Sequence, residues 1–232
     1  MTSGPDEIPP IYCMSAPANE PRRARMRRRM DEVGLTCSFL STALTGGDVR
    51  QLVAGSGRTE PAGFEHRTAA VMLGHLELIR RFVEETRAPH GIVCEDDVYL
   101  RRTIKRDLPS IVRNFDTRGL DVLLLGYLWP WRDDEPGYRF CDYDDELWGT
   151  QMYLLSRSQA IHLIETYTLD WALAHWAVRP FSPDWIITKT GRRARLSPML
   201  AVEEGEVGTT HAGQVDFHRR CAAAQYDPAN YL

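Results

Sequence analysis

Short apolar runs alternate with longer amphipathic stretches along this chain. Residues 11–14 form an apolar run, and after a break that contains proline a helix-length stretch covers residues 20–33. Within that stretch Met26, Met30 and Val33 recur at positions i, i+4 and i+7, which puts them on one face of a helix. The alternation of strand-sized and helix-sized segments predicts an α/β domain.

The rest of the chain continues this alternation. The uninterrupted apolar run at residues 91–94 is typical of a strand buried in a parallel sheet. Further strands are predicted at 37–40, 121–125, 151–155 and within 193–200, helices at 67–86, 103–114, 158–166 and 171–176, and loops at 45–61 and 126–148. We therefore expect a central, mostly parallel sheet flanked by helices, in a single domain over residues 11–232 that follows a flexible N-terminal arm of residues 1–10.

Composition narrows the class of protein. The chain has 232 residues, of which 43% are hydrophobic and 26% are charged, so a core can form without disulfides or structural metal. Its 32 acidic residues outnumber 28 basic ones, which argues against a nucleic-acid partner, because such domains usually carry a basic excess. Among the basic residues only Lys105 and Lys189 are lysines.

Targeting features are also informative. The first ten residues have neither the basic start nor the apolar stretch of a secretory signal. No run approaches the roughly 20 apolar residues of a membrane helix. The five cysteines include no Cys-x-x-Cys motif, which fits free thiols in a reducing compartment. These features predict a soluble, cytoplasmic protein.

Three consecutive carboxylates follow the strand at 91–94. Adjacent like charges near an apolar core raise one another's pKa, and a bound cation removes that penalty. In an extended backbone Glu95 and Asp97 project to one side and Asp96 to the other. Carboxylate ligands of this kind suit Mn²⁺ or Mg²⁺ together with the oxygens of a diphosphate. The alternative is a solvated acidic turn, but residues 98–100 resume an apolar pattern directly afterwards, which favours a cleft.

Several motifs in order resemble the family-25 glycosyltransferases, the group that contains bacterial lipooligosaccharide galactosyltransferases and collagen galactosyltransferases. The resemblance runs from Ile11 to about His211. It rests on the first strand with the arginine-rich segment 21–26, Gly74-His75-Leu76, the segment Glu95-Asp96-Asp97-Val98, the strand 121–126, the segment 149–156 that starts at Gly149, and Pro183-Asp184-Trp185. The resemblance implies a GT-A type α/β fold, a nucleotide-sugar donor that is commonly UDP-galactose, manganese (Mn²⁺, or Mg²⁺), and inverting transfer to a hydroxyl.

The resemblance also implies a donor site, and two departures fall near it. Residues expected to bind the donor are Arg22 and Arg25 at its diphosphate, with Met14, His75, Asp96 and Gly149 around it. The family's first strand usually ends in Asn-Leu where this chain has Met14-Ser15, and its helix usually reads Ser-His where this chain has Gly74-His75. Without the resemblance, the arginines indicate a solvated basic face and His75 a satisfied core histidine.

Asp184 is the candidate general base. An inverting displacement needs a carboxylate that takes the proton of the acceptor hydroxyl as its oxygen attacks the anomeric carbon. Phe181 and Trp185 beside it would stack on a sugar face. The alternative role for Asp184 is a helix cap, and the two roles are compatible.

Histidines near the carboxyl terminus can complete the metal site. The proposed ligands are Glu95, Asp97 and His211, with His218 and Asp216 as alternatives that the sequence does not separate. Tryptophans flank the acidic loop and are candidates for gripping a sugar or for core positions; they are Trp129, Trp131 and Trp148.

Together these features predict a metal-dependent inverting glycosyltransferase. It would move a hexose, galactose or glucose, from a UDP-sugar to a hydroxyl of a glycan or protein acceptor. The alternative is a protein of the same fold that binds sugar nucleotides without transferring them, and a carboxylate-metal nuclease fits the net acidity less well.

Overall fold

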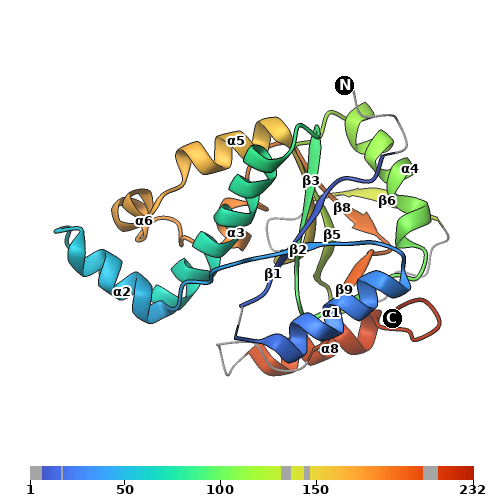
Figure 1. Cartoon of the computed structure of the whole chain (residues 1–232), viewed down its shortest axis with the longest axis horizontal. Helices are drawn as coiled ribbons and strands as arrows, with labels where there is room; N and C mark the ends of the chain where they lie inside the picture. Colours follow the sequence, from blue (N-terminus) through green and yellow to red (C-terminus); the bar gives the residue numbers. More distant parts are fainter. Residues whose placement is uncertain (1–6, 17, 132–136, 144–146, 206–213) are drawn as a thin grey trace.

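A seven-stranded mixed sheet forms the centre of the computed structural model, which describes residues 7–16, 18–131, 137–143, 147–205 and 214–232 (Figure 1). The strand order is β2-β1-β3-β7-β5-β8-β6. The strands are β1 (Ile11–Met14), β2 (Ser38–Phe39), β3 (His90–Glu95), β5 (Val122–Leu128), β6 (Arg139–Asp142), β7 (Trp148–Ser156) and β8 (Arg193–Ser197). A smaller sheet pairs β4 (Val98–Leu100) with β9 (Ala201–Glu203).

The strand directions confirm the predicted fold class. β2, β1, β3, β5 and β8 run in one direction, while β7 and β6 run in the other. The antiparallel β7 lies between β3 and β5, so the sheet is mixed at its centre although most strands are parallel in direction.

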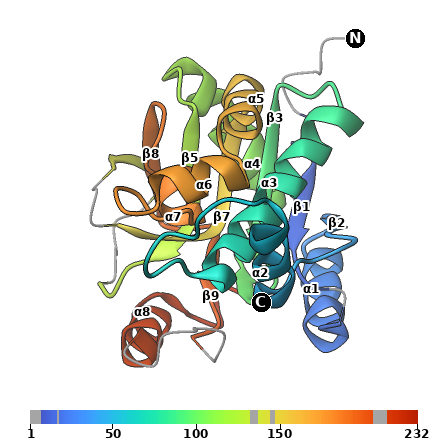
Figure 2. The same cartoon turned by 90° about the vertical axis from the view of Figure 1, so that its left-hand side faces the viewer.

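Helices cover both faces of the sheet. They are α1 (Glu20–Glu32), α2 (Gly46–Gly55), α3 (His66–Glu85), α4 (Ile104–Thr117), α5 (Arg157–Thr166), α6 (Leu169–His175), α7 (Pro183–Ile186) and α8 (Val215–Gln225). Successive residues of β3 enter opposite cores: Ile92 and Cys94 pack with α1 and α4, and Val93 packs with α2, α3 and α5. α1 and α8 lie at the same end of the molecule in both views (Figures 1 and 2). None of the described helices has both the length and the apolar composition needed to cross a bilayer.

The predicted loop at 45–61 is wrong in its first half, because α2 occupies it. The Thr45 side chain accepts a hydrogen bond from the Asp48 N–H while the Asp48 carboxylate accepts one from the Thr45 N–H, so two groups at the helix start are satisfied. Val49 and Val53, one turn apart, are buried. The predicted loop at 126–148 is wrong in part as well, since it contains the end of β5 and all of β6.

Candidate active site

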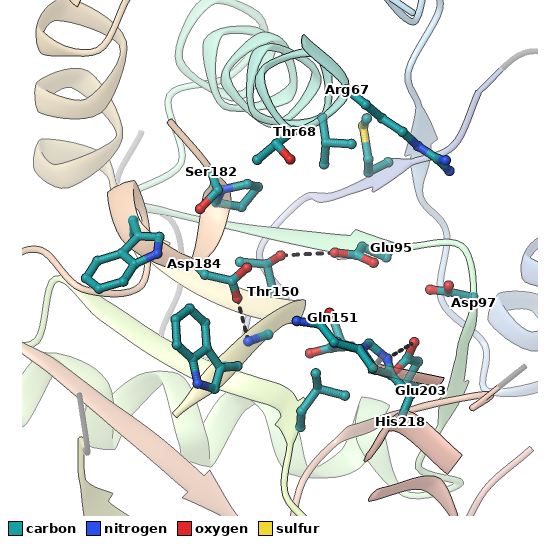
Figure 3. Close-up of a pocket in the computed structure, with 18 of the residues that line it drawn as sticks. Arg67, Thr68, Glu95, Asp97, Thr150, Gln151, Ser182, Asp184, Glu203 and His218 are labelled. Atoms are coloured by element: carbon teal, nitrogen blue, oxygen red, sulfur yellow. Dashed lines mark hydrogen bonds and ion pairs between the residues drawn. The ribbon is translucent and has the colours of Figure 1, made fainter. Parts of the chain in front are cut away.

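A cavity of about 670 Å³ opens where several chain segments end at one edge of the sheet (Figure 3). Met14 and Glu95 are register partners at the ends of the parallel strands β1 and β3. β7 runs the opposite way, so its first residues reach the same edge. The starts of α3, α7 and α8 complete the wall. Six carboxylates line this cavity against two arginines, Arg22 and Arg67. The carboxylates are Glu65, Glu95, Asp96, Asp97, Asp184 and Glu203.

The acidic triplet lies on one wall, where Glu95 ends β3. The Thr150 hydroxyl donates a hydrogen bond to Glu95 Oε1 at 3.0 Å. Burial raises the pKa of Glu95 well above its usual value, and the charges of Asp97 and Glu203 raise it further. The Glu95 side chain is 28% exposed, and its carboxylate lines the cavity. Burial likewise raises the pKa of Asp97 to about 6, against the opposing effect of Arg22.

Arg22 lies against two carboxylates of the triplet. Its Nε is 2.8 Å from Asp96 Oδ1, and its Nη2 contacts Asp97 Oδ2. The Ser15 hydroxyl donates to the other Asp96 oxygen. Asp97 Oδ1 is buried and has no hydrogen-bond partner among the described residues. A buried oxygen without a hydrogen-bond partner carries a desolvation cost. A cation bound to that oxygen would remove the cost.

Glu203 and His218 form a pair on the adjoining wall. Of the two, only His218 is among the residues predicted from the sequence. His218 Nδ1 lies 2.8 Å and 2.7 Å from the two Glu203 oxygens. Burial opposes the charged imidazole, but Glu203, Asp97 and Asp184 raise the net pKa of His218. In residues 201–204 two apolar residues are followed by two acidic ones. The acidic triplet likewise follows an apolar run, so the same pattern could have indicated Glu203.

The predicted metal ligands are only partly brought together. Glu95 and Asp97 line the cavity, whereas His211 lies outside the described residues. Of the alternatives, His218 lines the cavity and Asp216 does not. No group of three His, Cys, Asp or Glu side chains in the described ranges forms a ready metal cage. The oxygen donors, their excess negative charge and the orphaned Asp97 oxygen fit a hard divalent cation that takes its remaining ligands from a substrate.

Asp184 lies to one side of Thr150 in the cavity, with Glu95 and Asp97 to the other (Figure 3). The Gly149 N–H donates to Asp184 Oδ1 at 2.5 Å. Burial raises the pKa of Asp184, while this hydrogen bond and the charge of Lys189 oppose the rise. Gly149 has φ +114°, a conformation that side chains rarely adopt, so only glycine fits easily at this position. The predicted helix is present as α7, but Ser182 is its N-cap residue and Asp184 lies in its first turn, so the predicted capping role of Asp184 is wrong.

Two tryptophans stand beside Asp184 at the cavity. The Trp148 and Trp185 rings meet edge to face at 5.6 Å, and Lys189 Nζ lies 4.0 Å and 4.2 Å from their centroids. Trp148 is 39% exposed. The predicted stacking role of Phe181 is wrong, because its ring is fully buried in the core. Trp129 and Trp131 pack edge to face on each other and do not line the cavity.

The remaining predicted donor residues divide into two groups. Met14, Arg22, Asp96 and Gly149 line the cavity. Arg25 does not, and it pairs instead with Glu204 at 3.3 Å. His75 lies behind Glu95, outside the lining. Arg67 also lines the cavity and was not predicted. Nothing in the sequence distinguishes it from the other arginines.

Met14 and Gly74, the two departures from the family pattern, contact each other. A Cβ on Gly74 would lie against Met14 Cε and 2.8 Å from its Sδ. The end of the Met14 side chain therefore fills the space that a larger residue at 74 would need. The Met14 side chain and the absence of a side chain at Gly74 therefore depend on each other sterically.

This pairing predicts strong non-additivity. We expect Gly74→Ala to destabilise the protein by about 1 kcal/mol, because overpacking exceeds the gain in helix propensity. In a Met14→Ala background the same change should stabilise it by up to about 1 kcal/mol. Urea unfolding of the four variants measures this cycle. Equal effects of Gly74→Ala in both backgrounds would contradict this steric dependence.

Comparison with known proteins gives distant likenesses. No protein-family profile and no curated protein sequence matches the chain. Among solved structures, A197 from STIV has 13% identity and a TM-score of 0.43, covering 88% of this chain and 100% of that one. A glycosyltransferase involved in the glycosylation of the major capsid of PBCV-1 has 12% identity and a TM-score of 0.43, with 92% and 99% covered. CMP:2-keto-3-deoxy-manno-octonic acid synthetase has 11% identity and a TM-score of 0.40, with 94% and 99% covered. Likeness at this level assigns neither a family nor a reaction.

Proposed function

We propose that this protein is a GT-A type, metal-dependent glycosyltransferase that moves a hexose from a UDP-sugar to an acceptor hydroxyl with inversion. The observation that carries the proposal is that Asp184 and the acidic triplet of Glu95, Asp96 and Asp97 line one cavity, with Asp184 to one side of Thr150 and Glu95 and Asp97 to the other (Figure 3). A general base and a leaving group must lie on opposite sides of the anomeric carbon in such a displacement.

A divalent cation would be held by Glu95 and Asp97, with Glu203 beside them and with His211 as a further proposed ligand. When bound, it would neutralise negative charge on the departing diphosphate. The six lining carboxylates support a need for such a cation, since a diphosphate would otherwise be repelled. Arg67, which has no ion-pair partner within the described part of the chain, is the side chain we assign to the donor phosphates in place of Arg25.

Asp184 would accept the proton of the acceptor hydroxyl. The acceptor oxygen forms a bond to the anomeric carbon as the bond from that carbon to the diphosphate oxygen breaks. The raised pKa of Asp184 suits a base that works near neutral pH. The exposed face of Trp148, together with Trp185, would hold the acceptor by stacking.

A ligand screen tests the proposal. We expect UDP-hexoses with Mn²⁺ to raise the melting temperature more than either component alone, because ligand that binds only the folded state stabilises it. We also expect slow Mn²⁺-dependent hydrolysis of one UDP-hexose in the absence of acceptor. A panel of nucleotide sugars that neither stabilises the protein nor is hydrolysed would refute the proposal. Stabilisation without hydrolysis or transfer would favour the alternative, a sugar-nucleotide-binding protein.

A further inference from the structure

His75 is a fully buried histidine that makes only half of its possible hydrogen bonds. It lies in α3, and its Nδ1 is 2.8 Å from the Tyr153 hydroxyl. The two rings stack at 5.8 Å with 25° between their planes. Its Nε2 is buried and has no hydrogen-bond partner in the part of the chain that the structure describes. A buried polar atom without a partner costs about 1–3 kcal/mol, so its retention calls for an explanation.

The unpartnered nitrogen faces the end of β3. Nε2 is 3.9 Å from Glu95 Oε1, the same oxygen that accepts the Thr150 hydroxyl. A shift of about 1 Å would bring this separation to a hydrogen-bond distance. Of the two residues only Glu95 lines the cavity, so a ligand there would act on the Glu95 carboxylate and not on the His75 ring.

The neighbours of His75 select one arrangement of its proton. The complete burial of His75 disfavours the charged imidazolium, so the ring is neutral and carries one N–H. With the proton on Nε2, the Tyr153 hydroxyl donates to Nδ1 and the N–H points toward Glu95. With the proton on Nδ1, the Nε2 lone pair would face the carboxylate and the Tyr153 proton would lose its acceptor. The first arrangement satisfies more groups.

We propose that His75, oriented by Tyr153, is a positioning residue that fixes the rotamer of Glu95 in the liganded cavity. Its Nε2–H then completes a second hydrogen bond to Glu95 Oε1 beside that from Thr150, which leaves Oε2 to face the bound ligand. This role rests on the proposed function, since it presumes that Glu95 contacts the cation or the donor. It acts through Glu95 and not through contact with substrate.

Nitrogen NMR of the full-length chain tests the tautomer directly. With ¹⁵N-labelled histidine at pH 7.5, we expect His75 to appear as the neutral Nε2–H tautomer, assigned by its loss in His75→Gln. Tyr153→Phe should shift the Nδ1 resonance, and Glu95→Gln should shift Nε2. The Nδ1–H tautomer, or a resonance that ignores both substitutions, would overturn the proposal whether or not the protein binds a nucleotide.

Ligand affinity tests the positioning role. We expect His75→Gln to weaken binding of UDP with Mn²⁺ by about 10-fold or more in calorimetry. Tyr153→Phe should weaken it less, and should add nothing in the His75→Gln background, whereas two separate packing defects would add. His162→Gln, a substitution of an exposed histidine on α5 that does not line the cavity, is the matched control and should bind like wild type. Unchanged affinity in both His75→Gln and Tyr153→Phe would refute the role, while wild type that binds no nucleotide would instead refute the proposed function.

Discussion

We expect Asp184→Asn to lower the rate of sugar transfer by about 10²–10⁴-fold while the affinity for the UDP-sugar and Mn²⁺ stays close to that of wild type. The substitution removes the basic oxygen but keeps the shape of the side chain. The amide oxygen of the introduced asparagine can still accept the hydrogen bond that the Gly149 N–H gives to Asp184. The loss should therefore appear in kcat and leave donor binding intact.

A surface variant controls for this experiment. Asp170 is exposed on α6 and pairs with Arg58 away from the cavity, so Asp170→Asn should transfer sugar at the wild-type rate. Donor binding by calorimetry and transfer by product assay are measured on the same preparations. An Asp184→Asn variant with wild-type turnover would remove Asp184 from the reaction, and weakened donor binding alone would make it a binding residue.

The segments that could be predicted from the sequence are those whose structure follows from the local order of apolar and polar residues. The apolar run before Glu95 predicts a buried strand, and the triplet after it predicts an acidic cluster at the strand end; both segments lie where expected. α2 was missed because its helix signal consists of a short capping box, Thr45 with Asp48, and two valines within a stretch rich in glycine.

Contacts between distant segments could not be predicted in the same way. Glu203 meets the triplet only because β9 pairs with β4, which follows the triplet directly. His75 meets Tyr153 across 78 residues, and neither residue type signals the other. Such pairs depend on the tertiary fold. The local spacing of apolar residues predicts secondary structure and not these contacts.

The arginines of α1 illustrate the same limit. Their spacing predicts a solvated face, yet Arg29 is mostly buried, donates to the Val98 carbonyl at 2.9 Å and pairs with Glu204 at 2.5 Å. Arg23 donates to the carbonyl of Ser15 at 3.1 Å and lies 5.2 Å from the Phe39 ring. Planar guanidinium groups can bond carbonyls and stack on rings together, which lysine does not do as well. Part of the excess of arginine over lysine therefore has a structural use.

The Asp97→Asn variant should be more stable than wild type at pH 8 and should lose Mn²⁺-dependent nucleotide binding. The pKa of Asp97 is raised from 3.8 to about 6, chiefly by burial, so the folded protein binds this proton more tightly than the unfolded chain. The free energy of unfolding therefore falls as pH rises from about 4 to 6, and the ionised carboxylate costs stability above that range. Asparagine removes this cost, and we expect a gain of roughly 1–3 kcal/mol at pH 8.

The pH dependence of that gain separates the electrostatic cause from a change in packing. At pH values below about 4, Asp97 is protonated in both states, so the two proteins should have nearly equal free energies of unfolding. A gain that persists there would point to packing instead. A loss of stability at pH 8 would mean that the contact between Arg22 and Asp97 outweighs the burial of the charge. A stabilised variant that no longer binds the nucleotide would show that Asp97 serves ligand binding and lowers the stability of the folded protein.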